Sequence, residues 1–163
     1  MAIAQSPGPR KATTALMTKG SARANAPRPL ASPATKWVLI VDDDEHILKS
    51  LELLMEVVGN GSKPRVRLAQ SGDEAMDLLE AQSFDLIISD YHMGAMDGVE
   101  FLSRAQQLEP DVPCVLLSAD PGVAEARLRS SPVRNAAFLP KPFEPALLVA
   151  LVMGALGWSD VHT

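Results

Sequence analysis

The sequence has few of the residues that hold small secreted domains together. Its 163 residues include a single cysteine, Cys114, which excludes an intramolecular disulfide and any cysteine-rich metal site. Aromatic residues make up only 4% of the chain against 47% for all hydrophobic residues, so a core must pack mainly on Val, Leu, Ile, Ala and Met. The composition also excludes a collagen-like, coiled-coil or mainly disordered chain. A lone thiol fits a reducing compartment, and we expect a cytoplasmic protein.

Acidic residues are absent from the first 36 positions. These positions hold six basic residues, nine alanines and five prolines, whereas the other 127 residues hold nine basic and twenty acidic residues, a net charge of −11. A segment of this composition buries too little apolar surface to offset its ordering entropy. We therefore expect a disordered basic tail over residues 1–36, one domain over residues 37–158, and a short C-terminal tail over residues 159–163. The acidic domain has no visible recognition module, so nucleic acid is not an expected partner.

No hydrophobic run is long enough to cross a membrane. The longest stretch without a polar side chain covers the thirteen residues 146–158, whereas a helical span needs about 20 residues. A helix that covers one face of a sheet needs only an apolar stripe. The surplus apolar face predicts contact with a partner, or a homodimer formed through this last helix. A packing face within the domain, rich in small residues, is the alternative.

Short apolar runs alternate with helical patterns along residues 37–158. The runs are rich in β-branched residues and end abruptly in polar residues, as the buried strands of a parallel sheet do. Ser71 and Glu74 form a capping box that predicts a helix start. Five strands alternating with five helices predict an α/β domain with a doubly wound five-stranded parallel sheet. The predicted strands are residues 37–41, 66–69, 86–89, 112–117 and 137–139, with helical patterns over residues 47–58 and 144–156 among others.

Chemically reactive side chains follow four of the five predicted strands. Asp42 and Asp43 follow the first strand, Asp90 the third, Ser118 the fourth and Lys141 the fifth. In doubly wound sheets such strand ends gather at one edge. Carboxylates that lie together repel one another unless a cation intervenes, and a hard divalent cation such as Mg²⁺ prefers oxygen ligands. The alternative is that the acidic run only places negative charge at a helix N-terminus.

This set of groups suits the binding of a phosphoryl group. Lys141 and the metal ion would neutralise phosphoryl oxygens, and Ser118 would donate a hydrogen bond. Asp90 is the best candidate for a nucleophile because it alone ends the third strand. Asp42 and Asp43 are better placed as metal ligands.

Four segments resemble the signatures of the response-regulator receiver domain. They are residues 41–44 (VDDD), 90–98 (DYHMGAMDG), 117–119 (LSA) and 141–143 (KPF), in the order and at spacings similar to those of the family. The resemblance covers about residues 37–158 and implies the flavodoxin-like (βα)5 fold. It further implies Asp90 as phosphoacceptor, Asp42, Asp43 and the backbone carbonyl of His92 as Mg²⁺ ligands, Lys141 as phosphoryl partner, and Ser118 with Phe138 as the switch residues.

The resemblance also implies partners. The phosphoryl donor would be a phosphohistidine on a sensor histidine kinase or a phosphotransfer protein, and the output would pass to another protein. Few residues follow the last predicted helix, so we expect a stand-alone receiver that is no enzyme beyond assisting its own phosphorylation and dephosphorylation. The chain departs from the family at Gly94, where a proline is usual, and Asp120 adds a negative charge near the site. Neither departure removes a reacting group.

Two other functions are compatible with parts of this pattern. A degenerate receiver would serve only as a docking or dimerisation module without phosphorylation, although the acid, hydroxyl and lysine set is intact. An unrelated α/β phosphotransferase or phosphatase would also use an aspartyl nucleophile. Enzymes that resemble haloacid dehalogenases place a nucleophile and an acid two residues apart after the first strand, and residues 42–44 lack the rest of that pattern.

Overall fold

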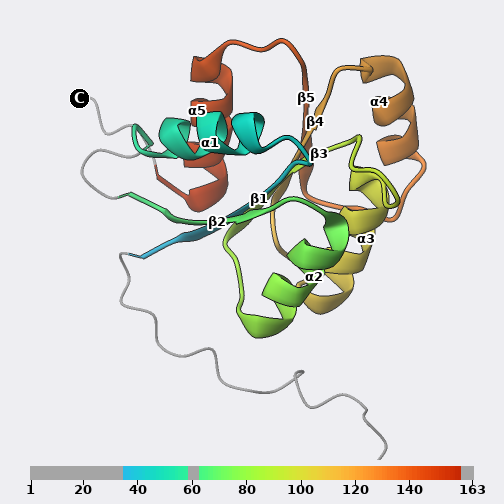
Figure 1. Ribbon diagram of the computed structural model, residues 1–163, viewed down its shortest axis with the longest axis horizontal. Helices are drawn as coiled ribbons and strands as arrows, with labels where there is room; N and C mark the ends of the chain where they lie inside the picture. Colours follow the sequence, from blue (N-terminus) through green and yellow to red (C-terminus); the bar gives the residue numbers. More distant parts are fainter. Residues whose placement is uncertain (1–34, 59–62, 159–163) are drawn as a thin grey trace, which may run out of the picture. The chain divides into compact units, whose positions relative to one another are not determined.

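A computed structural model describes residues 35–58 and 63–158 of the chain. Residues 1–34 of the tail predicted over residues 1–36, and the whole of the tail predicted over residues 159–163, lie outside the described residues. Strands and helices alternate in the predicted order (Figure 1). The elements are β1 (Trp37–Val41), α1 (Glu45–Met55), β2 (Arg65–Ala69), α2 (Gly72–Ala81), β3 (Leu86–Asp90), α3 (Gly98–Leu108), β4 (Cys114–Ser118), α4 (Pro121–Arg129), β5 (Ala136–Pro140) and α5 (Pro145–Leu156).

The five strands form one parallel sheet in the order β2-β1-β3-β4-β5. Val41 at the end of β1 lies opposite both Ala69 of β2 and Ser89 of β3. The strand order reverses at β1, so the crevice beyond the carboxyl ends of the strands opens between β1 and β3. This is the doubly wound, flavodoxin-like sheet that the sequence predicts.

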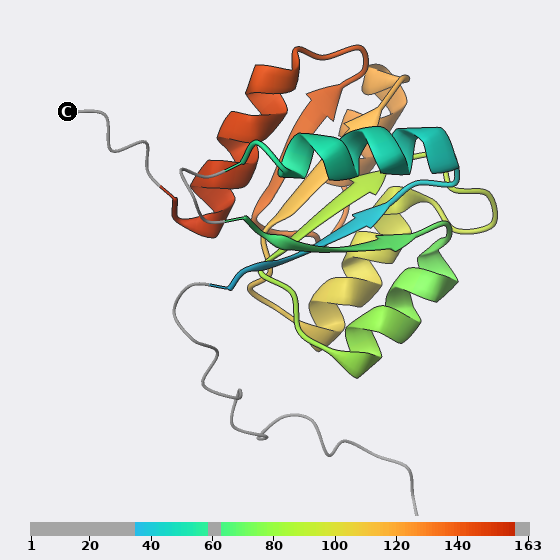
Figure 2. The same ribbon diagram turned by 60° about the vertical axis from the view of Figure 1, so that its left-hand side comes forward.

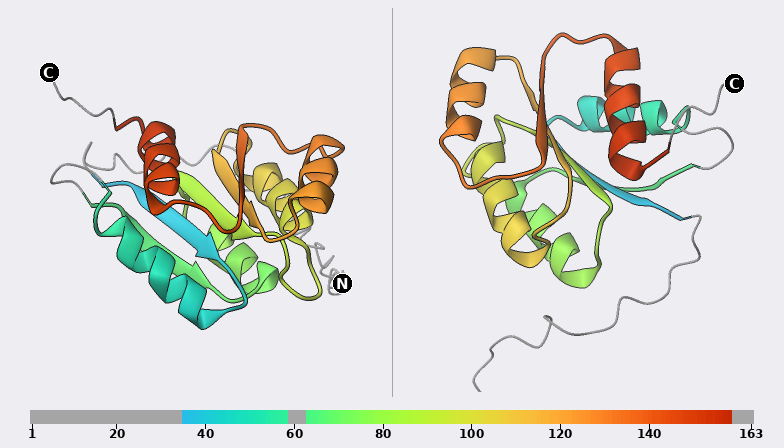
Figure 3. Two further views of the ribbon diagram at one scale, coloured as in Figure 1. Left: turned by 90° about the horizontal axis from the view of Figure 1, so that it is seen from above. Right: turned by 180° about the vertical axis from the view of Figure 1, so that it is seen from behind.

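Helices cover both faces of the sheet (Figures 2 and 3). Alternate residues of each strand point to opposite faces, so that Leu39 packs in the core beneath α2, α3 and α4, while Ile40 packs in the core beneath α1 and α5. The central strands β3 and β4 are buried at every position. This double burial explains why both strands are apolar on both faces until the polar residues at their carboxyl ends.

Side-chain caps fix where most of the helices begin. Ser71 accepts a hydrogen bond from the N–H of Glu74, as the capping box predicts, and the carboxylate of Glu74 reaches back to the N–H of Gln70. Asp97 and Asp120 cap α3 and α4 in the same way. Each cap satisfies backbone donors that the first turn of a helix leaves unpaired.

Two predicted boundaries are wrong by two or three residues. The first helix ends at Met55 instead of continuing to Val58, which stays buried in the tighter turn that follows. The fourth strand begins at Cys114 and not at residue 112. Pro113 has no N–H to donate to the sheet, although its carbonyl still accepts a hydrogen bond from Ile87.

Candidate functional site

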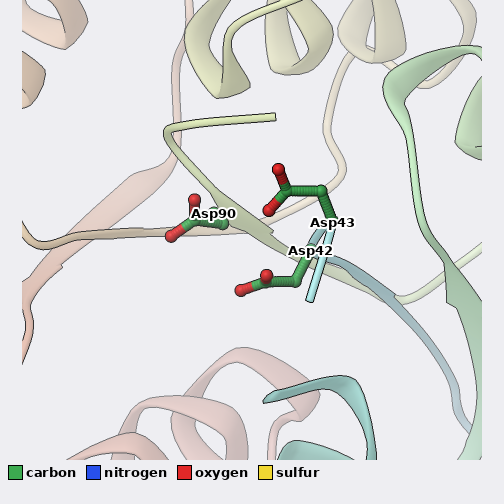
Figure 4. A group of neighbouring side chains, drawn as sticks. All are labelled: Asp42, Asp43 and Asp90. Carbon is green, nitrogen blue, oxygen red and sulfur yellow. The ribbon is translucent and has the colours of Figure 1, made fainter. Parts of the chain in front are cut away.

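Three carboxylates meet at the carboxyl ends of β1 and β3. Asp42 and Asp90 are almost fully buried, with 2% and 7% of their surface exposed, whereas Asp43 is exposed. One oxygen atom from each carboxylate lies within 4.8 Å of the other two. Figure 4 shows the three side chains around a common space at the sheet edge. The structure therefore brings together the three acids that the sequence singled out.

Lys141 lies between the two buried carboxylates. Its Nζ atom is 2.7 Å from Oδ1 of Asp90 and 3.2 Å from Oδ2 of Asp42. Burial by itself would lower the pKa of Lys141, but the hydrogen bond and charge of Asp90, together with the charge of Asp42, raise that pKa above its usual value. Lys141 is therefore a charged ammonium group held at the end of β5.

Main-chain donors hold the second oxygen of each buried carboxylate. The N–H of Asp44 donates to Oδ1 of Asp42 over 2.9 Å, and the N–H of His92 donates to Oδ2 of Asp90 over 2.8 Å. Burial raises the pKa of Asp42, and the bond from Asp44 and the charge of Lys141 oppose that rise. The two buried side chains are thus fixed at both oxygens, each by one ammonium contact and one backbone contact.

The acidic run after β1 divides into two roles. Asp42 turns into the site, whereas Asp44 caps α1 by accepting from the N–H of His46 and Glu45 lies in the exposed first turn. Negative charge at a helix N-terminus interacts favourably with the helix dipole. The simple helix-capping interpretation of the run therefore holds for Asp44 and Glu45 but not for Asp42.

Ser118 and Phe138, the two predicted switch residues, lie on neighbouring strands. Ser118 is fully buried, and its hydroxyl donates to the carbonyl of Asp120 and accepts from the N–H of Asp120. Its own carbonyl accepts from the N–H of Lys141 over 2.7 Å. Phe138 is half-buried on β5 and packs against the core on the α4 side. In this structure the Ser118 hydroxyl is therefore bonded to the turn that begins α4.

The glycine that follows the loop after Asp90 and begins α3 packs against the backbone of Asp90, a contact that the sequence did not predict. A Cβ atom added to Gly98 would collide with the backbone carbonyl oxygen of Asp90, and the N–H of Gly98 donates to the carbonyl of Tyr91 over 2.8 Å. Gly94, in the same loop, has a φ of 78°, in the left-handed region that favours glycine. The available signal was a glycine as the first residue of a helix, where its low helix propensity is unfavourable.

The donor set of this site fits a hard divalent cation. The three acids supply carboxylate oxygens, and neither sulfur nor a ring nitrogen belongs to the cluster. Mg²⁺ prefers such oxygen ligands and commonly binds through one or two carboxylates. The charge of Lys141 neutralises only part of the negative charge of the three acids. The remaining negative charge favours the binding of a cation.

No helix within the described residues is both long enough and apolar enough to cross a membrane. This finding covers α5, whose twelve residues contain no charged side chain.

The site thus combines three carboxylates and one lysine at the carboxyl edge of a doubly wound parallel sheet. Residues 38–153 match the sequence model of the response regulator receiver domain. The chain belongs to the receiver-domain family of two-component response regulators.

Curated relatives include longer regulatory proteins. The chain is 32% identical over 126 residues to the transcriptional regulatory protein GlrR of Escherichia coli (strain K12), an alignment that covers 77% of this chain and 27% of that protein. It is 32% identical over 119 residues to the response regulator MprA of Mycolicibacterium vanbaalenii, covering 73% of this chain and 49% of that one. The chain thus spans about a quarter to a half of the length of these relatives.

This chain resembles solved structures of receiver domains, and each alignment covers nearly the whole of the solved chain. A putative response regulator from Chloroflexus aurantiacus J-10-fl has a TM-score of 0.65 and 31% identity, covering 76% of this chain and 98% of that one. The signal receiver domain of an HD domain-containing protein from Pseudomonas fluorescens Pf-5 has a TM-score of 0.68 and 28% identity, covering 76% of this chain and 95% of that one. These likenesses agree with the predicted receiver fold.

Proposed function

We propose that Asp90 accepts a phosphoryl group from a phosphohistidine of a sensor histidine kinase or a phosphotransfer protein. The observation that carries this proposal is the contact of Asp90 with Lys141, at 2.7 Å, inside a cluster of acids. A carboxylate oxygen of Asp90 forms the new P–O bond, and the P–N bond of the phosphohistidine breaks, leaving its electron pair on the imidazole nitrogen. Lys141 stabilises negative charge on the phosphoryl oxygens during this transfer.

The proposal includes Mg²⁺ as the required cation. Asp42, Asp43, Asp90 and the backbone carbonyl of His92 would hold it, and when bound it supplies positive charge that neutralises the phosphoryl oxygens. Asp43, the exposed acid of the cluster, remains accessible to a cation from solvent. Asp42 and Asp90 are already oriented by Lys141 and by main-chain donors.

In this proposal phosphorylation biases a two-state switch. The new phosphoryl oxygens at Asp90 attract the hydroxyl of Ser118, and Phe138 moves with the rearranged strand end. Support comes from the strand register, in which Leu117, the neighbour of Ser118, lies opposite Asp90. The hydroxyl therefore starts on the strand that borders the phosphoacceptor.

We propose that the signal leaves the domain, residues 37–158, through contacts with an output protein or with a second copy of the chain. The domain catalyses no reaction except its own phosphorylation and dephosphorylation, and it acts in the cytoplasm. Because the curated relatives are two to four times longer than the aligned region, stand-alone action stays a prediction. The alternative is a degenerate receiver that needs no phosphorylation, and the experiment must distinguish it from a phosphoaccepting receiver.

The test is phosphorylation by a small donor. Wild-type protein incubated with acetyl phosphate and Mg²⁺ is expected to gain the mass of one phosphoryl group, and Asp90→Asn is expected to gain none. Beryllium fluoride, a phosphoryl mimic, should shift the backbone amide signals of Ser118 and Phe138 only when Mg²⁺ is present. Asp44→Asn is the matched control, because it removes an acid next to the cluster while asparagine keeps the helix cap.

The possible outcomes of this experiment distinguish the proposed function from the two alternatives. If the mass does not change and beryllium fluoride shifts no signal, the degenerate receiver is the function that the result favours. Continuous turnover of an external phosphoester, unaffected by Asp90→Asn, would favour an unrelated phosphatase. A phosphorylated Asp44→Asn protein together with an unreactive Asp90→Asn protein supports the proposal.

A further inference from the structure

β2 is an edge strand, with β1 on one side and no strand of the described chain on the other (Figure 1). The N–H of Arg65 donates to the carbonyl of Lys36, and the carbonyl of Ala69 accepts from the first residue after β1. Successive residues of a strand direct their backbone groups to opposite sides. Val66 and Leu68 therefore direct their N–H and C=O groups away from β1, where no residue of the described chain pairs with them.

The two faces of β2 have different side chains. Val66 and Leu68 are partly buried against the core beneath α1 and α5. Arg65 and Arg67 are exposed on the opposite face, where Trp37 of β1 lies opposite Arg65. Each of the two guanidinium groups lies 5.5 Å from the centroid of the Trp37 ring, a cation–π contact. The strand thus combines unpaired backbone groups along its edge with two positive side chains beside one aromatic ring.

These two arginines have no carboxylate partner among the described residues. The described chain has ten basic side chains, and seven of them form ion pairs with acids. The three that do not are Arg65, Arg67 and Arg134, although nineteen acidic residues are described. Two neighbouring positive charges without a counter-ion attract an anionic group.

We infer that an acidic, extended segment of a partner protein adds to β2 as a further strand. Its backbone bonds the outward groups of Val66 and Leu68, and its carboxylates at two alternate positions contact Arg65 and Arg67. Alternate residues of any strand are about 6.6–6.8 Å apart, so acids two positions apart match the spacing of the two arginines. Guanidinium–carboxylate bonds are among the strong hydrogen bonds of proteins. The inference goes beyond the proposed function and does not depend on phosphorylation of Asp90.

The open length of the edge is short. Beyond Leu68 and Ala69, the N–H of Gln70 donates to the carboxylate of Glu74 over 2.7 Å, so that α2 closes the edge at this end. An added strand of about five residues is sufficient to pair with the open part.

The open backbone favours a peptide over other anions. A nucleic acid or a free phosphate offers negative charge, but a peptide strand also offers donors and acceptors at the spacing of β2. Pairing β2 with the same strand of a second copy would bring Arg65 and Arg67 against like charges, which is destabilising. Charged side chains on an edge strand oppose indiscriminate pairing, and their positive sign here selects an acidic strand.

Titration with a synthetic peptide tests the contact. The probe is a capped hexapeptide of alternating glutamate and valine, and binding is followed by the fluorescence of Trp37 in the Trp158→Phe variant. We expect saturable binding that weakens as the salt concentration rises, with slower hydrogen exchange at the amides of Val66 and Leu68. A peptide with three adjacent glutamates and three adjacent valines should bind at least about fivefold more weakly, because its acids cannot all lie on one face. Absence of binding at millimolar probe would overturn the inference.

Substitutions on β2 test the role of charge. The double variant Arg65→Gln, Arg67→Gln is expected to bind the probe at least about tenfold more weakly. Arg134→Gln is the matched control, because Arg134 is exposed, lacks an ion pair within the described chain and lies outside β2. An equal loss in Arg134→Gln would overturn the inference, as would binding of single-stranded oligothymidylate without binding of the peptide. Asp90→Asn should bind as wild type does, so failure of phosphorylation with retained peptide binding would overturn the proposed function alone.

Methylation of the peptide backbone tests strand addition without changing the protein. When the valines of the probe lie opposite Val66 and Leu68, an antiparallel strand turns the N–H groups of its valines toward β2, whereas a parallel strand turns those of its glutamates. We therefore expect one of two probes, N-methylated at the valines or at the glutamates, to lose at least about tenfold in affinity. The other should bind as the unmodified probe does. Equal affinities of the two methylated probes would contradict strand addition and overturn the inference.

Discussion

Lys141 is the residue on which the charge balance of the site depends. It is the ammonium group that contacts both buried carboxylates, at 2.7 Å and 3.2 Å. Removing one partner of a buried ion pair leaves uncompensated charge, and this costs more than the pair contributes when intact. The electrostatics of the acid cluster can therefore be tested at this one side chain.

We expect Lys141→Met to lower the free energy of unfolding by about 2 kcal/mol at neutral pH. Burial raises the pKa of Asp42, and loss of the lysine raises it further. A carboxyl group with a raised pKa in the folded state favours folding more as the pH falls. The stability difference between wild type and variant should therefore shrink as the pH falls from 7 to 5, measured by urea unfolding. Lys49→Met, an exposed lysine on α1, is the control, and an equal loss there would contradict the argument.

Cys114 provides a second prediction at the scale of a single residue. Burial raises the pKa of its thiol to about 12, so the folded protein should not react with iodoacetamide at pH 8, while the unfolded protein should. Because the thiol ionises near its usual pKa only after unfolding, stability should fall above pH 9 by about 1.4 kcal/mol per pH unit. The loss is measured relative to Cys114→Ala by chemical unfolding at each pH. Rapid alkylation of folded protein would contradict the burial.

Two glycines at helix starts have opposite expected effects. Gly98 begins α3 against the backbone carbonyl of Asp90, whereas a Cβ atom on Gly122, in the first turn of α4, would meet nothing within 4 Å. Gly98→Ala should destabilise the fold by about 2–3 kcal/mol, because backbone cannot yield as a flexible side chain does. Gly122→Ala should stabilise it by about 0.5–1 kcal/mol. Urea unfolding of the two variants checks both signs, and a neutral Gly98→Ala would contradict the contact.

Most elements follow from local sequence patterns because burial and capping leave strong local signals. The runs that became β3 and β4 are apolar up to their polar carboxyl ends because both faces of these strands are covered, and Ser71 caps α2 as its spacing predicts. The placement of the acids at one sheet edge follows from parallel topology. The contact of Lys141 with Asp42, 99 residues apart, has no local signal and was expected only from strand ends that gather at one edge.

Other features depend on neighbours that no sequence window contains. The residues of the run after β1 are all acidic, but their side chains lie in different environments. Asp42 is buried and Asp44 caps α1, because the chain turns between them. The hydroxyl of Ser118 bonds both backbone groups of Asp120, a local contact that the sequence did not predict, and its predicted contact with a phosphoryl group stays a prediction. Differences of tenths of an ångström decide which of two partners a hydroxyl bonds. The periodicity of a sequence does not determine such distances.

At the scale of the whole molecule, α4 is the helix with the fewest buried residues among the five described helices. Of its nine residues only Ala124 is buried, whereas α3 buries five residues in the same core. The Ser118 hydroxyl closes the turn that leads into α4 by bonding both backbone groups of Asp120, over 3.1 Å and 3.0 Å. A segment with few buried contacts opens at low free energy. The first turn of α4 therefore depends on where this hydroxyl points.

A phosphoryl group on Asp90 should compete for the hydroxyl and release that turn. With beryllium fluoride and Mg²⁺ we expect faster hydrogen exchange at the amides of Asp120 and Val123, and unchanged exchange in α3. Ser118→Ala lacks the hydroxyl, so its exchange at these amides should be fast at the outset and should not respond to the mimic. Bound beryllium fluoride with unaltered exchange in wild type would show that α4 is not coupled to the site. The comparison separates coupling through Ser118 from a general loosening of the domain, because general loosening would also reach α3.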